Sequence, residues 1–129
     1  MKFKPVIAVD WDGTCVESVW PKKGDWLPGA KKALKRLTRD YTVNIWTTRI
    51  VGVNFFNLNE VLPRELVEKE IAYIRGMLDD AGLQEVEIFE TYPHGVPGKL
   101  GAVAYIDDKA VRFDGNWPRT LRQLNRLGV

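Results

Sequence analysis

A chain of 129 residues, 45% hydrophobic and 28% charged, suits one folded domain over residues 1–129 and leaves no room for a second. The formal net charge of +2 is too small to predict nucleic-acid binding from composition, and the single cysteine, Cys15, excludes an internal disulfide and favours a cytoplasmic location. No targeting segment is visible and no apolar run is long enough to span a bilayer, so we expect no membrane partner.

The first predicted strand is the apolar run Val6–Val9, which is typical of a strand buried on both faces of a parallel sheet. Asp10 and Asp12 follow it on the same side of the chain, and Gly13 permits a sharp turn. Ligands bind at this carboxyl edge in open α/β sheets. Two like charges there repel each other, and Mg²⁺ would remove the conflict because it prefers carboxylate and phosphate oxygens. The alternative is a turn whose carboxylates cap backbone N–H groups.

Residues 15–29 are predicted to form a loop or short flap, since they contain the breakers Pro21, Gly24, Pro28 and Gly29. Trp20 and Trp26 lie in this flap beside lysines and could grip a ligand that carries a phosphate or a base. Packing of these tryptophans on the core is the favoured interpretation.

A helix is predicted from about Pro28, because apolar residues recur there at helical spacing. Its other faces carry a run of basic residues: Lys31, Lys32, Lys35, Arg36 and Arg39. We interpret this run as a solvated helix surface, with attraction of a polyanion as the alternative.

The second predicted strand, residues 42–46, ends in Thr47-Thr48-Arg49. Hydroxyl groups at the end of a strand can donate to a phosphate oxygen, and an arginine can bind phosphate with two N–H groups. The alternative is that the threonines serve β propensity. Residues 50–60 are expected to be irregular and part of a site wall, and a long amphipathic helix follows Pro63 and ends at Gly82.

A short third strand, residues 86–89, leads through a loop that ends at Lys99 to a fourth strand, residues 102–106, and a second acidic pair, Asp107-Asp108. Lys99 could offset the charge of these carboxylates. From about Pro118 a last helix is expected to pack its leucines against the sheet. This order of elements predicts an α/β fold, a parallel sheet with helices on both sides.

These residues resemble the motifs of the haloacid dehalogenase (HAD) superfamily of phosphohydrolases. Asp10-Trp11-Asp12-Gly13-Thr14 matches its first motif, D-x-D-G-T, Thr47 the second, Lys99 the third and Asp107-Asp108 the fourth, in the right order over residues 6–108. The resemblance implies a Rossmann-like three-layer sandwich around a central parallel sheet. The segments between the motifs leave no room for a cap domain, so a capless core is expected.

The resemblance also implies roles for these residues. Asp10 would be the nucleophile, and Asp12 the general acid and then the general base. Mg²⁺ would be held by Asp10, the carbonyl of Asp12 and the second acidic pair, with Asp108 favoured over Asp107 as the direct ligand. The phosphate would be held by Thr47 and Lys99 with backbone N–H groups near Trp11 and Gly13, and Thr48 and Arg49 are further candidates from the strand end.

The implied function is a Mg²⁺-dependent phosphomonoesterase that works through an aspartyl-phosphate. A capless site is open, so the phosphorylated substrate ranges from a small molecule or nucleotide to a nucleic-acid end or a phosphoprotein, unless a neighbour in an oligomer covers the site. One alternative is a phosphotransferase or phosphomutase of the same fold. Another is an idle HAD-like domain that binds a phosphorylated partner or nucleic acid through its basic helix, although the joint presence of Asp10, Asp12, Thr47, Lys99 and Asp108 argues against it.

Overall fold

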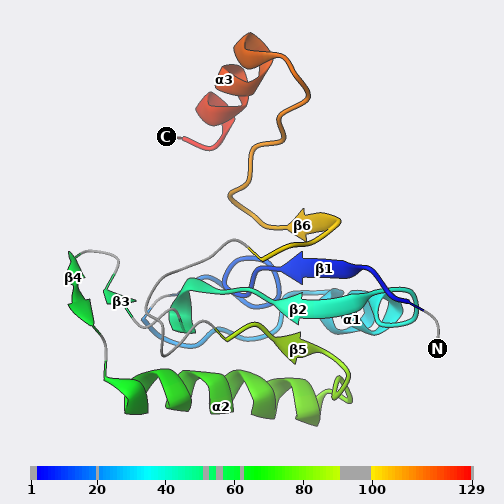
Figure 1. Ribbon diagram of the computed structural model, residues 1–129, viewed down its shortest axis with the longest axis vertical. Coiled ribbons are helices and arrows are strands. Elements are labelled where there is room, and N and C mark those ends of the chain that lie inside the picture. Colours follow the sequence, from blue (N-terminus) through cyan, green and yellow to red (C-terminus); the bar gives the residue numbers. More distant parts are fainter. Residues whose placement is uncertain are drawn as a thin grey trace.

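The computed structural model describes residues 3–19, 21–50, 63–90 and 100–128, and the backbone of residues 53–54 and 57–61. Its centre is a sheet of four parallel strands in the order β5-β2-β1-β6 (Figure 1). The strands are β1 (Val6–Val9), β2 (Thr42–Ile45), β5 (Glu87–Ile88) and β6 (Ala104–Ile106). This confirms the predicted α/β class with a central, Rossmann-like parallel sheet.

The core lies between this sheet and two helices, α1 (Ala30–Leu37) and α2 (Arg64–Asp80). Leu34 of α1 and Ile74 of α2 belong to the same buried cluster as Ile7, Val9 and Ile45 of the sheet. Both helices therefore cover one face, as two right-handed crossovers in the same direction require. Each such side chain contributes about 1.5–3 kcal/mol by leaving water, and together they fix β1 in the middle of the molecule.

The flap of residues 15–29 folds back on itself beside the core. The N–H of Glu17 donates to the carbonyl of Asp25 (2.9 Å), and the N–H of Leu27 donates to that of Cys15 (2.9 Å). Trp26 packs edge-on against buried Trp11, with 5.3 Å between the ring centroids. The predicted loop is confirmed, and so is the packing of Trp26 on the core, whereas Trp20 lies outside the described residues.

The prediction of irregular structure over residues 50–60 is wrong. A short 3₁₀ turn, η1 (Thr48–Ile50), is followed by an antiparallel hairpin of β3 (Val53–Asn54) and β4 (Asn57–Val61). In Asn57-Leu58-Asn59-Glu60-Val61 the alternation of polar and apolar residues breaks at Glu60, so the two-residue period of a strand is not visible in the sequence. The asparagines of this segment also favoured a loop, because asparagine is depleted in strands.

The last helix, α3 (Trp117–Arg126), forms where it was predicted but does not pack against the sheet. Its first turn is capped by the side chain of Asn116, which accepts the N–H of Arg119 (3.0 Å). The segment after β6 carries α3 beyond the edge of the sheet (Figure 1), so Trp117 and Leu121 remain 64% and 55% exposed. The expected packing is wrong because an amphipathic pattern defines an apolar face without defining what covers it.

Candidate functional site

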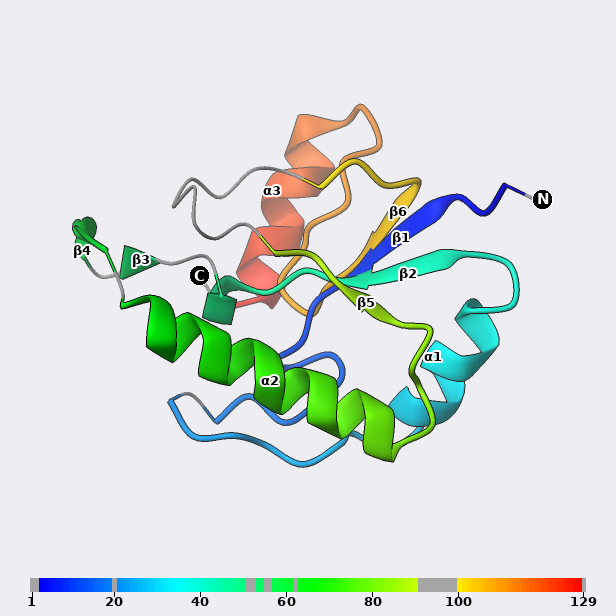
Figure 2. The same ribbon diagram turned by 60° about the horizontal axis from the view of Figure 1, so that its bottom comes forward.

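The sheet topology brings the two acidic segments together. β1 and β6 are parallel neighbours with Val9 opposite Ile106, and the N–H of Asp10 donates to the carbonyl of Ile106 (2.9 Å). β2 and β5 lie on one side of β1 while β6 lies on the other (Figure 2). Asp10, which directly follows β1, therefore stands at the point where the strand order reverses. In open α/β sheets ligands bind at this point, beyond the carboxyl ends of the strands.

Three carboxylates converge at this place. Asp10, Asp107 and Asp108 each offer an oxygen, and these oxygens all lie within 4.8 Å of one another. Burial, the negative charge of Asp107 and a hydrogen bond with Asp108 raise the pKa of Asp10 to about 7, against the opposing effect of the Trp11 N–H. Gathering like charges in this way costs free energy unless protons or a cation bind. Three carboxylate oxygens are a suitable ligand set for a hard divalent cation such as Mg²⁺.

Partial compensation of this charge comes from the chain itself. Lys109 Nζ lies 3.6 Å from Asp108 Oδ2, and the N–H of Lys109 donates to Asp107 Oδ1 (2.8 Å). The hydroxyl of Thr14 donates to Asp10 Oδ2 over a long 3.5 Å. The Lys109 side chain is 75% exposed, so water screens its contribution. The cluster therefore keeps negative charge that a bound cation can neutralise.

Gly13 closes the turn against this cluster. Its φ is +84°, and a Cβ at this position would lie 2.3 Å from Asp108 Oδ2. Only glycine satisfies both the backbone conformation and the close approach. The first and the last acidic motif are thus in contact.

Asp12 faces a different partner from Asp10. Both of its oxygens accept from Arg49, Oδ2 from Nε and Oδ1 from Nη2, each at 2.7 Å. Arg49 Nη2 also donates to the carbonyl of Lys22 in the flap (2.7 Å), and Nη1 lies 3.6 Å from Glu70 Oε2. Burial lowers the pKa of Arg49, but Asp12 and Glu70 outweigh burial and raise it. Arg49, predicted to bind phosphate, is only 4% exposed and links Asp12 to the flap and to α2.

The other predicted phosphate ligands differ in exposure. Thr47 is buried at the end of β2, and its Oγ1 accepts the N–H of Arg49 (3.2 Å), while Thr48 is exposed. The Trp11 ring is in the core, which leaves its backbone for a ligand, and the N–H of Gly13 donates to the carbonyl of Val16 (2.8 Å). Lys99 lies outside the described residues.

Sequence reasoning missed Glu70, the second carboxylate beside Arg49. A signal for it exists: Glu70 lies three residues after Val67 and four before Ile74, both buried, so helical spacing puts it on the inward face of α2. A charge on that face needs a partner. The carbonyl of Lys22, which also accepts from Arg49, could not have been predicted as a partner, because every residue has a backbone carbonyl.

The chain is similar to a solved structure, that of a conserved protein coded by a locus from Bacteroides thetaiotaomicron. The two are 27% identical with a TM-score of 0.55, and the alignment covers 97% of this chain and 93% of the other. The likeness supports the α/β fold. No protein-family model and no curated protein matches the chain. Within the described part of the chain, no helix has the length and apolar character needed to cross a membrane.

Proposed function

We propose that this protein is a Mg²⁺-dependent phosphomonoesterase with a capless HAD-type core. The observation that carries the proposal is the convergence of Asp10, Asp107 and Asp108 at the switch point of a parallel sheet. The match of the four motifs is independent support, because the motifs come from four separate segments of the chain.

The donor set fits a Mg²⁺ ion. Asp10, Asp107 and Asp108 would hold it, because all three offer hard oxygen ligands and their mutual repulsion favours a bound cation. When bound, the ion supplies positive charge that offsets the substrate phosphate, so that an anionic nucleophile can approach.

The chain's own residues supply the covalent chemistry. A carboxylate oxygen of Asp10 forms a bond to phosphorus while the bond to the leaving oxygen breaks, and Asp12 gives that oxygen a proton. Water then attacks the aspartyl-phosphate and gives its proton to Asp12, which releases inorganic phosphate and restores Asp10. Asp12 takes part once one of its oxygens leaves the Arg49 fork, and Arg49 keeps the carboxylate oriented until then.

A second candidate function is a domain that binds Mg²⁺ and a phosphorylated ligand without turnover. The specific observation that favours it is the bidentate pair, because Arg49 occupies both oxygens of the proposed general acid. A phosphotransferase, which passes the phosphoryl group to a hydroxyl other than water, would use the same residues.

Release of inorganic phosphate separates these candidates. Para-nitrophenyl phosphate, mononucleotides and 5′-phosphorylated oligonucleotides are tested with and without Mg²⁺, in the wild type and in Asp10→Asn. Asp80→Asn, an exposed aspartate on α2, is the control. The phosphatase requires Mg²⁺-dependent release that is lost in Asp10→Asn and kept in Asp80→Asn. Mg²⁺ binding by calorimetry without release from any substrate would support the binding domain or a phosphotransferase that lacks its acceptor.

A further inference from the structure

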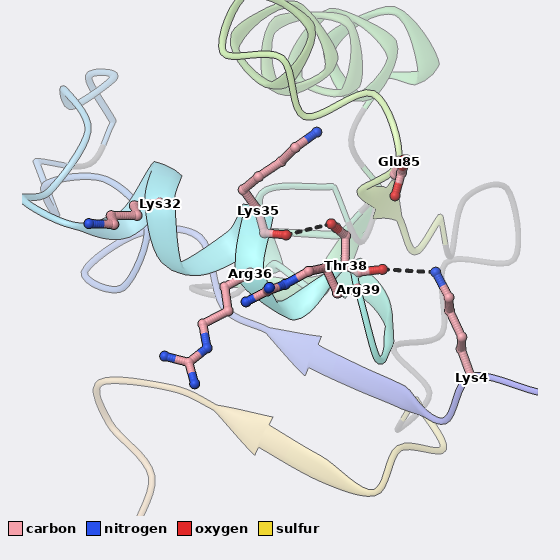
Figure 3. Close-up of a pocket in the computed structure, with 7 residues that line it drawn as sticks. All are labelled: Lys4, Lys32, Lys35, Arg36, Thr38, Arg39 and Glu85. Carbon is pink, nitrogen blue, oxygen red and sulfur yellow. Dashed lines mark hydrogen bonds between the residues drawn. The ribbon is translucent and has the colours of Figure 1, made fainter.

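A groove lined by basic residues lies on the far side of the molecule from the acidic cluster. Its volume is about 750 Å³. It lies between the end of α1, the segment that precedes β1 and the turn before β5 (Figure 3). We call it the basic groove; its described lining consists of Lys4, Lys32, Lys35, Arg36, Thr38, Arg39 and Glu85. It therefore gathers five cationic side chains around a single carboxylate.

The basic groove is separate from the candidate active site. Lys4 precedes β1 and Glu85 precedes β5, so the groove lies at the amino ends of parallel strands whose carboxyl ends carry Asp10. Six residues of nearly extended chain from Lys4 to Asp10 span roughly 20 Å. A ligand the size of a mononucleotide cannot occupy both places.

The described residues give two cations of the groove hydrogen-bond partners, but give none of the five an ion-pair partner. Lys4 Nζ donates to the carbonyl of Thr38 (2.9 Å) and Lys35 Nζ to that of Gly82 (3.3 Å), but no ion pair among the described residues includes any of the five. The hydrogen bond of Lys4 ties it to the end of α1 and keeps it beside the other cations (Figure 3).

On α2, unlike α1, exposed arginines form ion pairs within the helix. On α2, Arg64 pairs with Glu68 and Arg75 with Asp79 one turn further on. The sequence of α1, Ala30–Leu37, contains no acidic residue at all. Mutual repulsion of cations along one helix is unfavourable, and a bound polyanion would relieve it.

We propose that the basic groove binds the phosphodiester backbone of single-stranded nucleic acid. Lys32 and Arg36 lie about 6 Å apart along the axis of α1, and Arg39 follows in the turn after the helix, so a row of cations meets a ligand with a regular row of anions. The described lining has no aromatic side chain, so binding is to phosphates and tolerates any base sequence. A duplex presents phosphates as well, so tighter binding of a 12-base-pair duplex than of a single strand would contradict the proposal.

The salt dependence of binding tests this proposal. A fluorescein-labelled 12-mer of thymidylate is titrated with protein, without Mg²⁺, and followed by fluorescence anisotropy. Each phosphate neutralised on a single strand contributes about −0.7 to the slope of log K against log salt, so three to five contacts predict a slope of roughly −2 to −3.5. Affinity should fall roughly 20- to 100-fold between 50 and 200 mM salt. Absence of binding at 50 mM salt would overturn the proposal.

Charge reversal locates the site. Arg36→Glu with Arg39→Glu should weaken binding roughly tenfold or more, because two phosphate contacts become repulsive. The control is Arg122→Glu with Arg126→Glu on α3, which changes the net charge equally on a helix that stands apart from the groove (Figure 1) and should change affinity less than about twofold. Circular dichroism verifies that both variants fold. Equal weakening by the two pairs would mean nonspecific attraction and would refute the site.

A competition experiment tests whether the ligand is nucleic acid or any polyanion. Unlabelled oligonucleotide should displace the labelled 12-mer, while polyglutamate at equal charge concentration should displace it poorly. Equal displacement would show a general anion surface and contradict the proposal. Binding is also measured in Asp10→Asn, which should bind like the wild type, so failure of the phosphatase proposal and failure of this one are separate results.

Discussion

Gly13 lies so close to Asp108 that a Cβ at residue 13 would be 2.3 Å from the Oδ2 of that aspartate. This contact joins the turn after β1 to the segment after β6, two parts of the chain that are far apart in sequence. Because Gly13 also has a φ of +84°, any side chain at this position strains the backbone and displaces a carboxylate of the cluster.

Gly13→Ala should therefore lose both stability and metal affinity. The positive φ alone costs about 1–2 kcal/mol for an L-residue, and the clash with Asp108 adds to it. We expect the free energy of unfolding, measured in urea, to fall by about 2–4 kcal/mol. Since Asp108 must move, we also expect Mg²⁺ affinity, measured by calorimetry, to fall at least roughly tenfold, equivalent to about 1.4 kcal/mol.

Gly82→Ala is the matched control for this substitution. Gly82 ends α2 with a φ of +74°, but nothing lies within 4 Å of a Cβ built on it. It should lose only the backbone part, about 1–2 kcal/mol, and keep the Mg²⁺ affinity of the wild type. Equal effects of the two substitutions on Mg²⁺ affinity would show that the contact between residue 13 and Asp108 has no role.

Arg49→Met should destabilise the protein strongly, because it leaves Asp12 and Glu70 beside each other without their shared cation. Removing one partner of a buried pair costs about 3–5 kcal/mol. Arg64→Met breaks the pair with Glu68, in which both side chains are at least 60% exposed, and should cost at most about 1 kcal/mol. Urea unfolding of both variants decides the matter.

A double-mutant cycle identifies the partner that matters. If the Asp12–Arg49 fork dominates, Asp12→Asn combined with Arg49→Met should be more stable than the sum of the two single losses predicts. Strict additivity would mean that Arg49 stabilises the fold through Glu70 or the Lys22 carbonyl instead.

The site was predictable from sequence where strand ends define it. Asp10 and Asp107 each follow an apolar run, and the ends of parallel strands meet at one edge, so their proximity follows from local pattern and topology. The buried position of Arg49 could not be predicted from the sequence. A cation after a strand is compatible with an open phosphate site and with a buried ion pair, and the choice depends on Asp12 and Glu70, which come from other segments.

The pKa of Asp10 predicts how pH affects the metal-free protein. Asp10 has a pKa of about 7 in the folded state and an ordinary value of 3.8, so between about pH 4 and pH 7 the folded state binds more protons than the unfolded state. The contribution of Asp10 to the free energy of unfolding therefore falls as pH rises through this range. Mg²⁺ competes with the proton, so the rise in Tm caused by Mg²⁺ should grow from near zero at pH 4.5 to its full value at pH 7.5.

Asp10→Asn removes the titrating group and should abolish the pH dependence of the Mg²⁺ effect. Without metal at pH 7.5 it relieves the repulsion by Asp107, and a gain of about 1 kcal/mol would raise Tm by roughly 3–5 °C. Potassium chloride at the ionic strength of the Mg²⁺ buffer controls for screening. If Asp10→Asn and the wild type gain equally from Mg²⁺ at every pH, the cation does not bind at this cluster.

The exposed apolar face of α3 should contribute little to the stability of the fold. A 3.6-residue period predicted the helix correctly, but 55% of Leu121 remains exposed, whereas Ile74 of α2 is fully buried. Leu121→Ala should change the free energy of unfolding by less than about 0.5 kcal/mol, since little apolar surface is lost from the core and alanine favours the helix. Ile74→Ala should cost about 2–5 kcal/mol, because it leaves a cavity. Denaturation in urea compares the two, and a loss in Leu121→Ala close to that in Ile74→Ala would mean that α3 is packed in solution, since only a covered leucine can contribute that much.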